Sequence, residues 1–204
     1  MSFPAFFDQV PRITMRDPLA SFLGASSDGT MEYSYHDAVR LAGHSCPTVA
    51  GSWLMVRAAV NALYPDEPAV RGGIAVEMPA PSDEGVTGVM AQVFTLVTGA
   101  AADNGFHGIG GHFVRQGLLE YADQPSSGLI RFTRLDTGKT VAVQLDLSSV
   151  PPSPALRELL GAAMHPDASE ADRKAFGEVW QARVERILTE HADDPSVVRV
   201  MAIN

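Results

Sequence analysis

The sequence predicts an α+β fold in which helices pack on a mixed, mostly antiparallel sheet. An amphipathic helix is expected to begin at Pro47, because apolar residues follow it at spacings of three and four. Two alternating segments, 129–135 and 139–147, are joined by Asp136-Thr137-Gly138 and predict a β-hairpin. The order of the expected elements, which is helix, strand, helix, hairpin and then helices, is typical of α+β domains.

Size and composition limit the class of protein. The chain has 204 residues, 46% of them hydrophobic and 19% charged, which are ordinary values for one domain with at most a small appendage. The 24 acidic and 15 basic residues give a net charge of −9 and form no basic block, so neither a nucleic acid nor an anionic membrane is an expected partner. No apolar run approaches the roughly 20 residues of a membrane span, and no secretion signal is recognisable, so the expected location is the cytoplasm.

The first part of the chain, residues 1–33, is expected to be an N-terminal arm rich in loops. Prolines at positions 4, 11 and 18 interrupt it, and the small residues of 24–29 are typical of a turn region. The α+β core is then expected to span residues 34–147.

Two helices are expected to open this core. Ser34 and Asp37 have the spacing of a capping box and predict a short helix over 35–41. The next helix begins at Pro47, since proline is tolerated in a first turn, and it ends before Pro65.

A strand, a helix and a glycine-rich segment are expected to follow. Alternating apolar residues predict a strand over 73–78, and an apolar stripe predicts a helix over 84–98 that ends at Gly99. Residues 102–112 read ADNGFHGIGGH, where four glycines make backbone freedom the main feature. The hairpin completes the core.

The remainder, residues 148–204, is expected to be a C-terminal helical extension. Ser-Pro and Ser-x-x-Asp start signals predict helices over 153–164 and 169–191. Residues 196–203 are apolar enough to add a last strand.

The strongest chemical signal is the run Gly-His-Ser-Cys-Pro at residues 43–47. Its Cys46 is the only cysteine of the chain, which excludes an intramolecular disulfide and a zinc ribbon. Cys46 falls at the expected start of a helix, where free N–H groups and the helix dipole favour a thiolate, the form that binds metal. His44 lies two residues earlier and can supply a second ligand. The alternative is that Cys46 is a small buried residue and that His44 is a hydrogen-bonded turn residue.

Two further histidines lie in the glycine-rich segment. His107 and His112 are candidate catalytic residues that would move protons, or further metal ligands. We expect residues 104–112 to form a second wall of the site, reaching the Cys46 helix across the fold or from a partner subunit. The alternative is a mobile surface loop.

The expected cofactor is zinc or another divalent transition metal, and haem is the alternative. For either, Gly43 and Gly110 are candidate cofactor contacts, since glycine lets the backbone approach a ligand closely. Phe106 is a third candidate, and with Phe113 and Trp53 it could pack on a haem whose axial ligand is cysteine or histidine.

The run at 43–47, which opens a long helix, is followed by a strand, by a helix that ends in Thr98-Gly99, and by the glycine-containing segment. In this arrangement, over roughly residues 34–147, the chain resembles the FmdE family, which takes its name from one of the subunits of formylmethanofuran dehydrogenase. The resemblance implies an α+β fold similar to the catalytic domain of glyceraldehyde-3-phosphate dehydrogenase, with helix–strand–helix followed by three strands. It also implies a homodimer and a metal site at the His–Cys element.

The chain departs from the family at positions where many members carry cysteine. Those regions read Glu84-Gly85-Val86 and Ala100-Ala101 here, and helices stand in place of the zinc ribbon that some members append. Histidines could replace the missing thiolates, giving a nitrogen-rich site suited to zinc, iron or haem.

These expectations leave three functions open. The first is a metal-binding FmdE-like protein that acts on a small-molecule substrate as a metal-dependent enzyme, polarising a carbonyl or activating water. The second is a haem-binding protein. The third is a homodimeric accessory or metal-carrier protein that has no catalytic activity.

Overall fold

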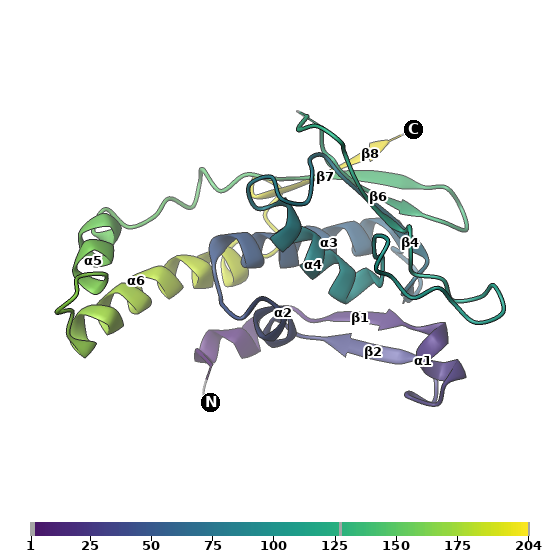
Figure 1. Cartoon of the computed structure of the whole chain (residues 1–204), viewed down its shortest axis with the longest axis horizontal. Helices are drawn as coiled ribbons and strands as arrows, with labels where there is room; N and C mark the ends of the chain where they lie inside the picture. The colour runs from purple at the N-terminus through teal and green to yellow at the C-terminus, as the bar shows by residue number, and fades with distance from the viewer. Residues whose placement is uncertain (1–2, 127, 204) are drawn as a thin grey trace.

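Two packed helices form the central layer of the molecule (Figure 1). The structure is a computed structural model that describes residues 3–126 and 128–203. Helix α3 (Pro47–Leu63) packs against α4 (Thr87–Thr98), with a five-stranded sheet on one side of the pair and a three-stranded sheet on the other. The other helices are η1 (Ala5–Gln9), α1 (Pro18–Phe22), α2 (Tyr35–Ala42), α5 (Leu156–Ala163) and α6 (Glu170–Thr189). None of the helices in the described residues is long and apolar enough to cross a membrane.

The larger sheet is mixed and mostly antiparallel, as predicted. Its strand order is β5-β4-β6-β7-β8, and only the β4–β5 pair is parallel. The smaller sheet has the order β2-β1-β3, in which β1 pairs with β2 antiparallel and with β3 parallel. The strands are β1 (Ile13–Arg16), β2 (Thr30–Tyr33), β3 (Ala69–Val70), β4 (Ile74–Met78), β5 (Leu119–Tyr121), β6 (Ile130–Arg134), β7 (Thr140–Leu145) and β8 (Val198–Ile203).

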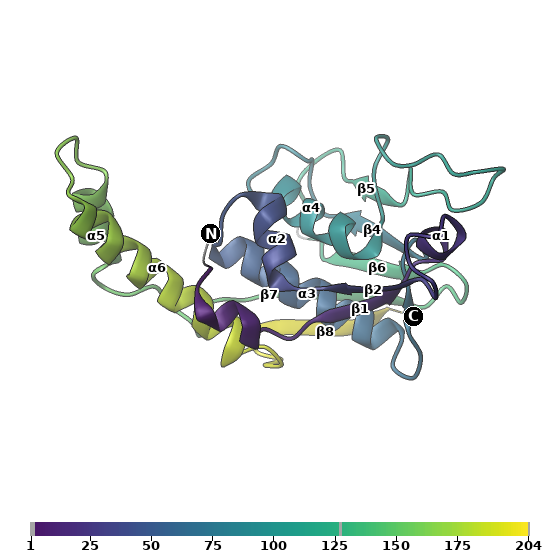
Figure 2. The ribbon, with the colours of Figure 1, turned by 90° about the horizontal axis from the view of Figure 1, so that it is seen from below.

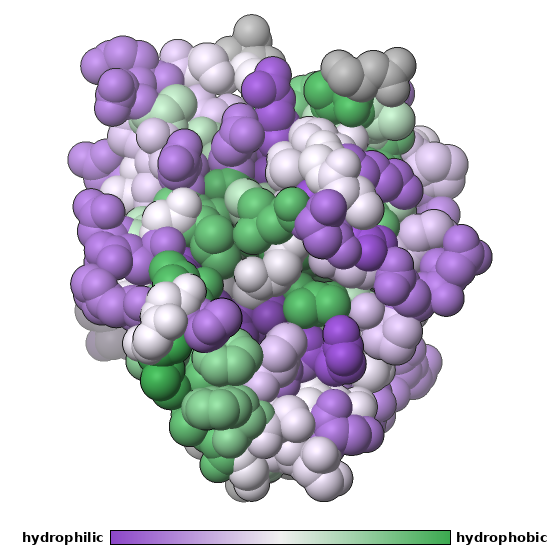
Figure 3. Space-filling view, turned by 90° about the vertical axis from the view of Figure 1, so that its right-hand side faces the viewer, coloured by the Kyte–Doolittle hydropathy of each residue, from purple (hydrophilic) through white to green (hydrophobic). Residues whose placement is uncertain are grey.

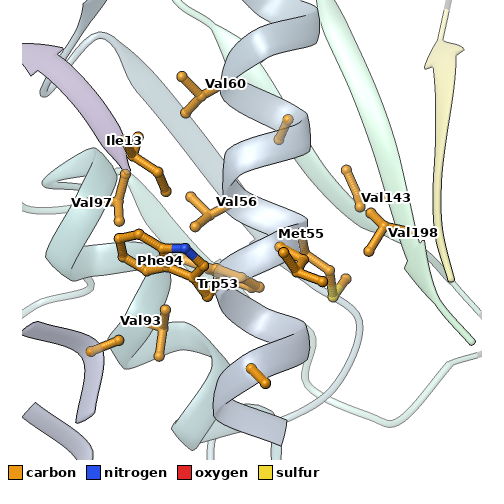
Figure 4. Packing of buried hydrophobic residues seen from close by; sticks show 14 of the residues in the cluster. Ile13, Trp53, Met55, Val56, Val60, Val93, Phe94, Val97, Val143 and Val198 are labelled. Carbon is orange, nitrogen blue, oxygen red and sulfur yellow. The ribbon is translucent and has the colours of Figure 1, made fainter. Parts of the chain in front are cut away.

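Helix α3 is buried on nearly all of its faces, because both sheets and α4 surround it. Eleven of its side chains are buried, so it has little of the one-sided apolar stripe of a surface helix. Figure 4 shows Trp53 among side chains of α4 and β1, while Met55 points toward β7 and β8. The Trp53 indole N–H also donates a hydrogen bond to the carbonyl of Pro11, 3.1 Å away. This packing fixes the position and direction of α3.

Most elements expected in the core and the extension are confirmed with boundary shifts of a few residues. The helix that begins at Pro47, the strand that ends at Met78, the hairpin and the last strand are all present. The order that the resemblance implies, helix–strand–helix and then three strands, is the order of α3, β4, α4, β5, β6 and β7. The short strands β3 and β5 were not predicted, because segments of two and three residues carry too little alternation to be recognised.

Residues 5–33 are not a loop-rich arm. They form η1, β1, α1 and β2, and their side chains Phe7, Ile13 and Met15 are buried in the common core. The prolines that suggested an arm lie at the borders of these elements, where proline is tolerated, as Pro18 is at the first position of α1.

The two C-terminal helices form a hairpin that projects from the body (Figures 1 and 2). Helix α5 has no buried residue, and α6 buries only Val184, Ile187 and Leu188, which lie toward its C-terminal end. The chain then returns to the larger sheet as its edge strand β8.

Three charged residues meet where the smaller sheet, the end of α4 and the segment before β5 come together. We call Asp17, Arg71 and Arg115 the Asp17 cluster. Asp17 accepts from Arg115 at 2.7 Å and from Arg71 at 2.9 Å. A Cβ at Gly72 would lie 1.8 Å from Nη1 of Arg115, so only glycine leaves room for this guanidinium. Burial opposes ionisation of the Asp17 carboxyl, but the hydrogen bond from Arg71 and the charge of Arg115 outweigh it, so the pKa of Asp17 lies below its usual value.

The Asp17 cluster predicts a pH-dependent loss of stability in Asp17→Asn. Asparagine can still cap α1, but it leaves two buried arginines without a carboxylate, which should cost about 3 kcal/mol at pH 7. Because the pKa of Asp17 is lowered in the folded state, its contribution is present above the unfolded pKa of about 3.9 and is lost as the pH falls through the folded value. Urea unfolding of both proteins at several pH values should therefore show the difference shrinking below about pH 4.

The exposed Asp83→Asn is the matched control, and its free energy of unfolding should stay within about 0.5 kcal/mol of the parent protein's. A destabilisation of Asp17→Asn that is the same at every pH, or none at all, would contradict the assigned role.

Candidate functional site

Cys46 lies at the start of α3, as the sequence predicted. Its backbone is extended (φ −149°), Pro47 is the first helical residue, and Cys46 is the N-cap. The sulfur accepts a hydrogen bond from the backbone N–H of Val49 at 3.4 Å. The residue is 9% exposed, so its thiol lies just below the surface. Free N–H groups at a helix start stabilise negative charge on such a sulfur.

His44 is exposed in the turn between α2 and α3. Its Nδ1 lies 2.9 Å from the carbonyl oxygen of Ala42. A carbonyl oxygen can only accept, so Nδ1 carries a proton, and in the neutral ring the free lone pair is on Nε2. Metal-binding histidines commonly donate their other ring N–H to a carbonyl in this way.

Helix α6 holds the turn through Ser45, a contact that the sequence did not reveal. The Ser45 carbonyl accepts from the Trp180 indole at 3.0 Å and from the Gln181 amide at 3.1 Å. The Ser45 hydroxyl donates to the Gln181 amide oxygen at 3.0 Å and lies 3.0 Å from the hydroxyl of Tyr35. Because the Ser45 proton is used for Gln181, the Tyr35 hydroxyl is the donor in the second contact. Burial raises the pKa of Tyr35, which keeps this donor protonated.

The turn of residues 43–47 therefore has one fixed side and one free side. Its middle residue is tied to α6, while the imidazole of His44 stays exposed and the sulfur of Cys46 keeps one backbone donor. Only α6 is sequence-distant among these partners, more than 130 positions away, which is why no local pattern predicted it.

The glycine-rich segment lies at the opposite end of α3 from Cys46 (Figures 1 and 2). Arg115, three residues after His112, reaches Asp17 beyond the C-terminal end of α3. A helix of 17 residues is about 25 Å long at 1.5 Å per residue. Within one copy of the chain, the structure brings His44 and Cys46 together in one turn but does not bring His107 or His112 to them. The described residues also contain no group of three or more His, Cys, Asp or Glu side chains that could hold a metal ion.

Close packing within the chain explains part of the glycine content of this segment. A Cβ at Gly105 would lie 2.5 Å from the backbone nitrogen of Gln116, so the two strands of the loop could not approach. Ile109 and His112 form a β-bridge across Gly110-Gly111, and the carbonyl of Phe106 accepts from the next strand. The loop is ordered by these backbone contacts, and His107 and His112 are exposed on it.

The same end of the molecule exposes apolar side chains (Figure 3). The loop and α1 meet where the Phe113 ring lies 5.2 Å from that of Phe22. Phe113 has a φ of +61°, which is unusual for a bulky residue. The exposed apolar residues around it are Phe22, Leu23, Phe106, Ile109 and Val114.

The aromatic residues proposed for haem packing do not share one pocket. Trp53 is fully buried inside the core, whereas Phe106 is 42% exposed on the loop. Gly43 lies in the Cys46 turn and Gly110 at the tip of the loop, so these two candidate cofactor contacts also lie at opposite ends of α3.

Comparison with known proteins gives a structural likeness. No family model matches the chain, and no curated protein matches it. Among solved structures, the chain is similar to the crystal structure of an FmdE-like protein of tungsten formylmethanofuran dehydrogenase from Syntrophus aciditrophicus. The two are 18% identical, and the likeness covers 84% of this chain and 73% of the other with a TM-score of 0.43. That protein carries the name of the family that residues 43–47 resemble, but a likeness of this size says nothing about the ligands of this chain.

The contact between α6 and the turn predicts how accessible Cys46 is. Trp180→Phe keeps an aromatic ring but removes the donor to Ser45, which should lower the free energy of unfolding by about 1 kcal/mol. If the same bond limits local opening of the turn, the reaction of Cys46 with a disulfide reagent such as DTNB should become about fivefold faster under native conditions.

Arg186→Gln is the control, since it removes a hydrogen bond of α6 to Pro151 that does not involve the turn. Its labelling rate should match that of the parent protein. Equal rates in Trp180→Phe and the parent would show that α6 does not govern access to Cys46.

Proposed function

We propose that the protein binds a divalent transition metal at the turn of residues 43–47, through Nε2 of His44 and Sγ of Cys46. The observation that carries the proposal is the hydrogen bond from His44 Nδ1 to the Ala42 carbonyl, which leaves Nε2 unprotonated and exposed two residues before the only thiol. Zinc is the favoured metal, because imidazole and thiolate together form a typical zinc donor set.

The two donors fit a metal but do not complete a site. A structural zinc has four protein ligands and a catalytic zinc has three, and the described residues place no third donor of these types beside the pair. The remaining positions would be filled by water, by a substrate, or by side chains from a second copy of the chain. His107 and His112 of a homodimer partner are suitable, since both are exposed on the described surface.

An incompletely coordinated metal favours a chemical role over a structural one. When bound, such a metal would act as a Lewis acid on a substrate carbonyl or would lower the pKa of a water. The residues of the chain would then orient the site: α6 fixes the turn through Ser45, and the Val49 N–H stabilises the Cys46 thiolate. We therefore favour a metal-dependent enzyme that acts on a small molecule, with a metal carrier as the alternative.

Metal binding is tested by elemental analysis and by titration with Co²⁺, whose bond to a thiolate gives a charge-transfer absorption. The parent protein should bind one metal ion per site, and both His44→Gln and Cys46→Ser should weaken binding more than about 100-fold while remaining folded. His165→Gln changes an exposed histidine outside the turn and should bind as the parent does. Unchanged metal content in folded Cys46→Ser would contradict the proposal, and a Soret band in the purified protein would favour haem.

The contribution of a second copy is a separate question with its own variants. His107→Ala and His112→Ala, made singly, should reduce metal occupancy if the loop of a partner subunit completes the site, and sedimentation should then show a dimer. If one variant alone loses metal, that histidine is the ligand and the other is free to move protons. If both retain full occupancy, the protein ligands are His44 and Cys46 alone.

A further inference from the structure

A cavity of about 440 Å³ opens beside the outer face of α4. It lies between the C-terminal end of α2, the strand β5 and the beginning of the glycine-rich segment, and we call it the α4 cavity. Leu41 lines it three residues before His44, so it lies near the α2 end that leads to the metal-binding turn. Its volume is in the range of small-molecule sites, which are about 300–1,000 Å³.

The chemistry of the lining is unusual for a chain with a net charge of −9. Among the described residues, no acidic side chain lines the cavity, and Arg71 is its only charged residue. Hydroxyl and amide groups of Ser82, Gln92, Asn104 and Tyr121 supply further hydrogen-bond donors, while Leu119 and Leu41 supply apolar surface. Such a lining favours an anionic or neutral ligand over a cation.

Arg71 is held rigidly, so its charge has a defined position. Its Nη1 donates to Asp17 at 2.9 Å, and its Nη2 donates to the carbonyls of Leu96 and Thr95 at the end of α4. Nη1 carries two hydrogens, and the carboxylate takes one of them. The side chain is 23% exposed, which leaves the guanidinium accessible from the cavity that it lines.

The charges behind Arg71 leave a positive excess. Asp17 is the only carboxylate within ion-pair distance of Arg71 or Arg115 in the described residues, and it is shared by both. The Arg115 side chain is 7% exposed, and its Nε and Nη1 have no hydrogen-bond partner in the described part of the chain. Two guanidinium groups against one carboxylate create a field that attracts an anion to the accessible member of the pair, which is Arg71.

We propose that the α4 cavity binds a small organic anion, whose carboxylate pairs with Arg71 and whose uncharged body lies along Leu119 and Tyr121. The proposal does not depend on metal binding at Cys46, because none of the residues that carry it lies in that turn.

The test uses 4-hydroxybenzoate as the probe and 4-hydroxybenzamide, which has the same shape without the charge, as the comparison. Titration of the ¹⁵N-labelled full chain, without added metal, is followed by amide chemical shifts. We expect saturable shifts at Ala102, Asn104 and Tyr121 with a dissociation constant in the millimolar range, and binding of the amide at least about tenfold weaker.

Two variants of the cavity are compared with one control. Arg71→Gln should abolish binding, but it also removes bonds to Asp17 and α4, so Gln92→Glu is the decisive variant. Gln92 is exposed on α4, and the change to glutamate keeps its shape while placing a negative charge in the lining, which should weaken 4-hydroxybenzoate about tenfold. Gln144→Glu adds the same charge on β7, outside the cavity, and should bind as the parent does.

Three results would overturn the proposal. One is the absence of saturable shifts at the cavity amides of the parent protein. Another is equal affinity for the acid and the amide, and the third is equal affinity in Gln92→Glu and Gln144→Glu. Each of these can be recorded whether or not the turn of residues 43–47 binds metal, so failure of one proposal is distinguishable from failure of the other.

Discussion

The burial of α3 between two sheets is the constraint on which the other features of the molecule depend. Eleven of its side chains are buried, so the helix cannot slide or rotate without breaking contacts with both sheets and with α4. Its N-terminal end therefore presents Cys46 at a fixed place on the surface. Its C-terminal end leads into β3, whose pairing with β1 sets the position of Arg71 opposite Asp17.

Each end of α3 thus has its own chemistry. At the start, a histidine with a fixed tautomer, a thiol and a helix N-terminus are suited to a cation that binds nitrogen and sulfur. At the far end, two arginines share one buried carboxylate and leave excess positive charge beside a cavity whose described lining has no acidic side chain. Helix α2 connects the two regions, because Leu41 lines the cavity and His44 follows one turn later. An organic anion in the cavity and a metal at the turn would then lie along the same face of α2.

Local sequence signals predicted the elements that have strong local causes. The start of α3 at Pro47, the capping boxes at Ser34 and Ser169, and the β6–β7 hairpin all depend on residues within a few positions of each other. The prediction failed where distant contacts decide the structure. Residues 5–33 lack a clear periodicity, yet Phe7 and Met15 complete the core. The bonds of Trp180 and Gln181 to Ser45, and those of Arg115 and Arg71 to Asp17, join segments far apart in the chain, and no single-sequence pattern marks them. His44 and Cys46 were found because two residues of one turn are adjacent in any fold.

The central claim is that the sulfur of Cys46 is a metal ligand. X-ray absorption at the zinc edge of the zinc-loaded protein tests it most directly, because sulfur and nitrogen scatterers lie at different distances from zinc, about 2.3 and 2.0 Å. The account predicts a first shell with one sulfur and at least one imidazole nitrogen, and loss of the sulfur in Cys46→Ser. A shell made only of nitrogen and oxygen in the parent protein would contradict it.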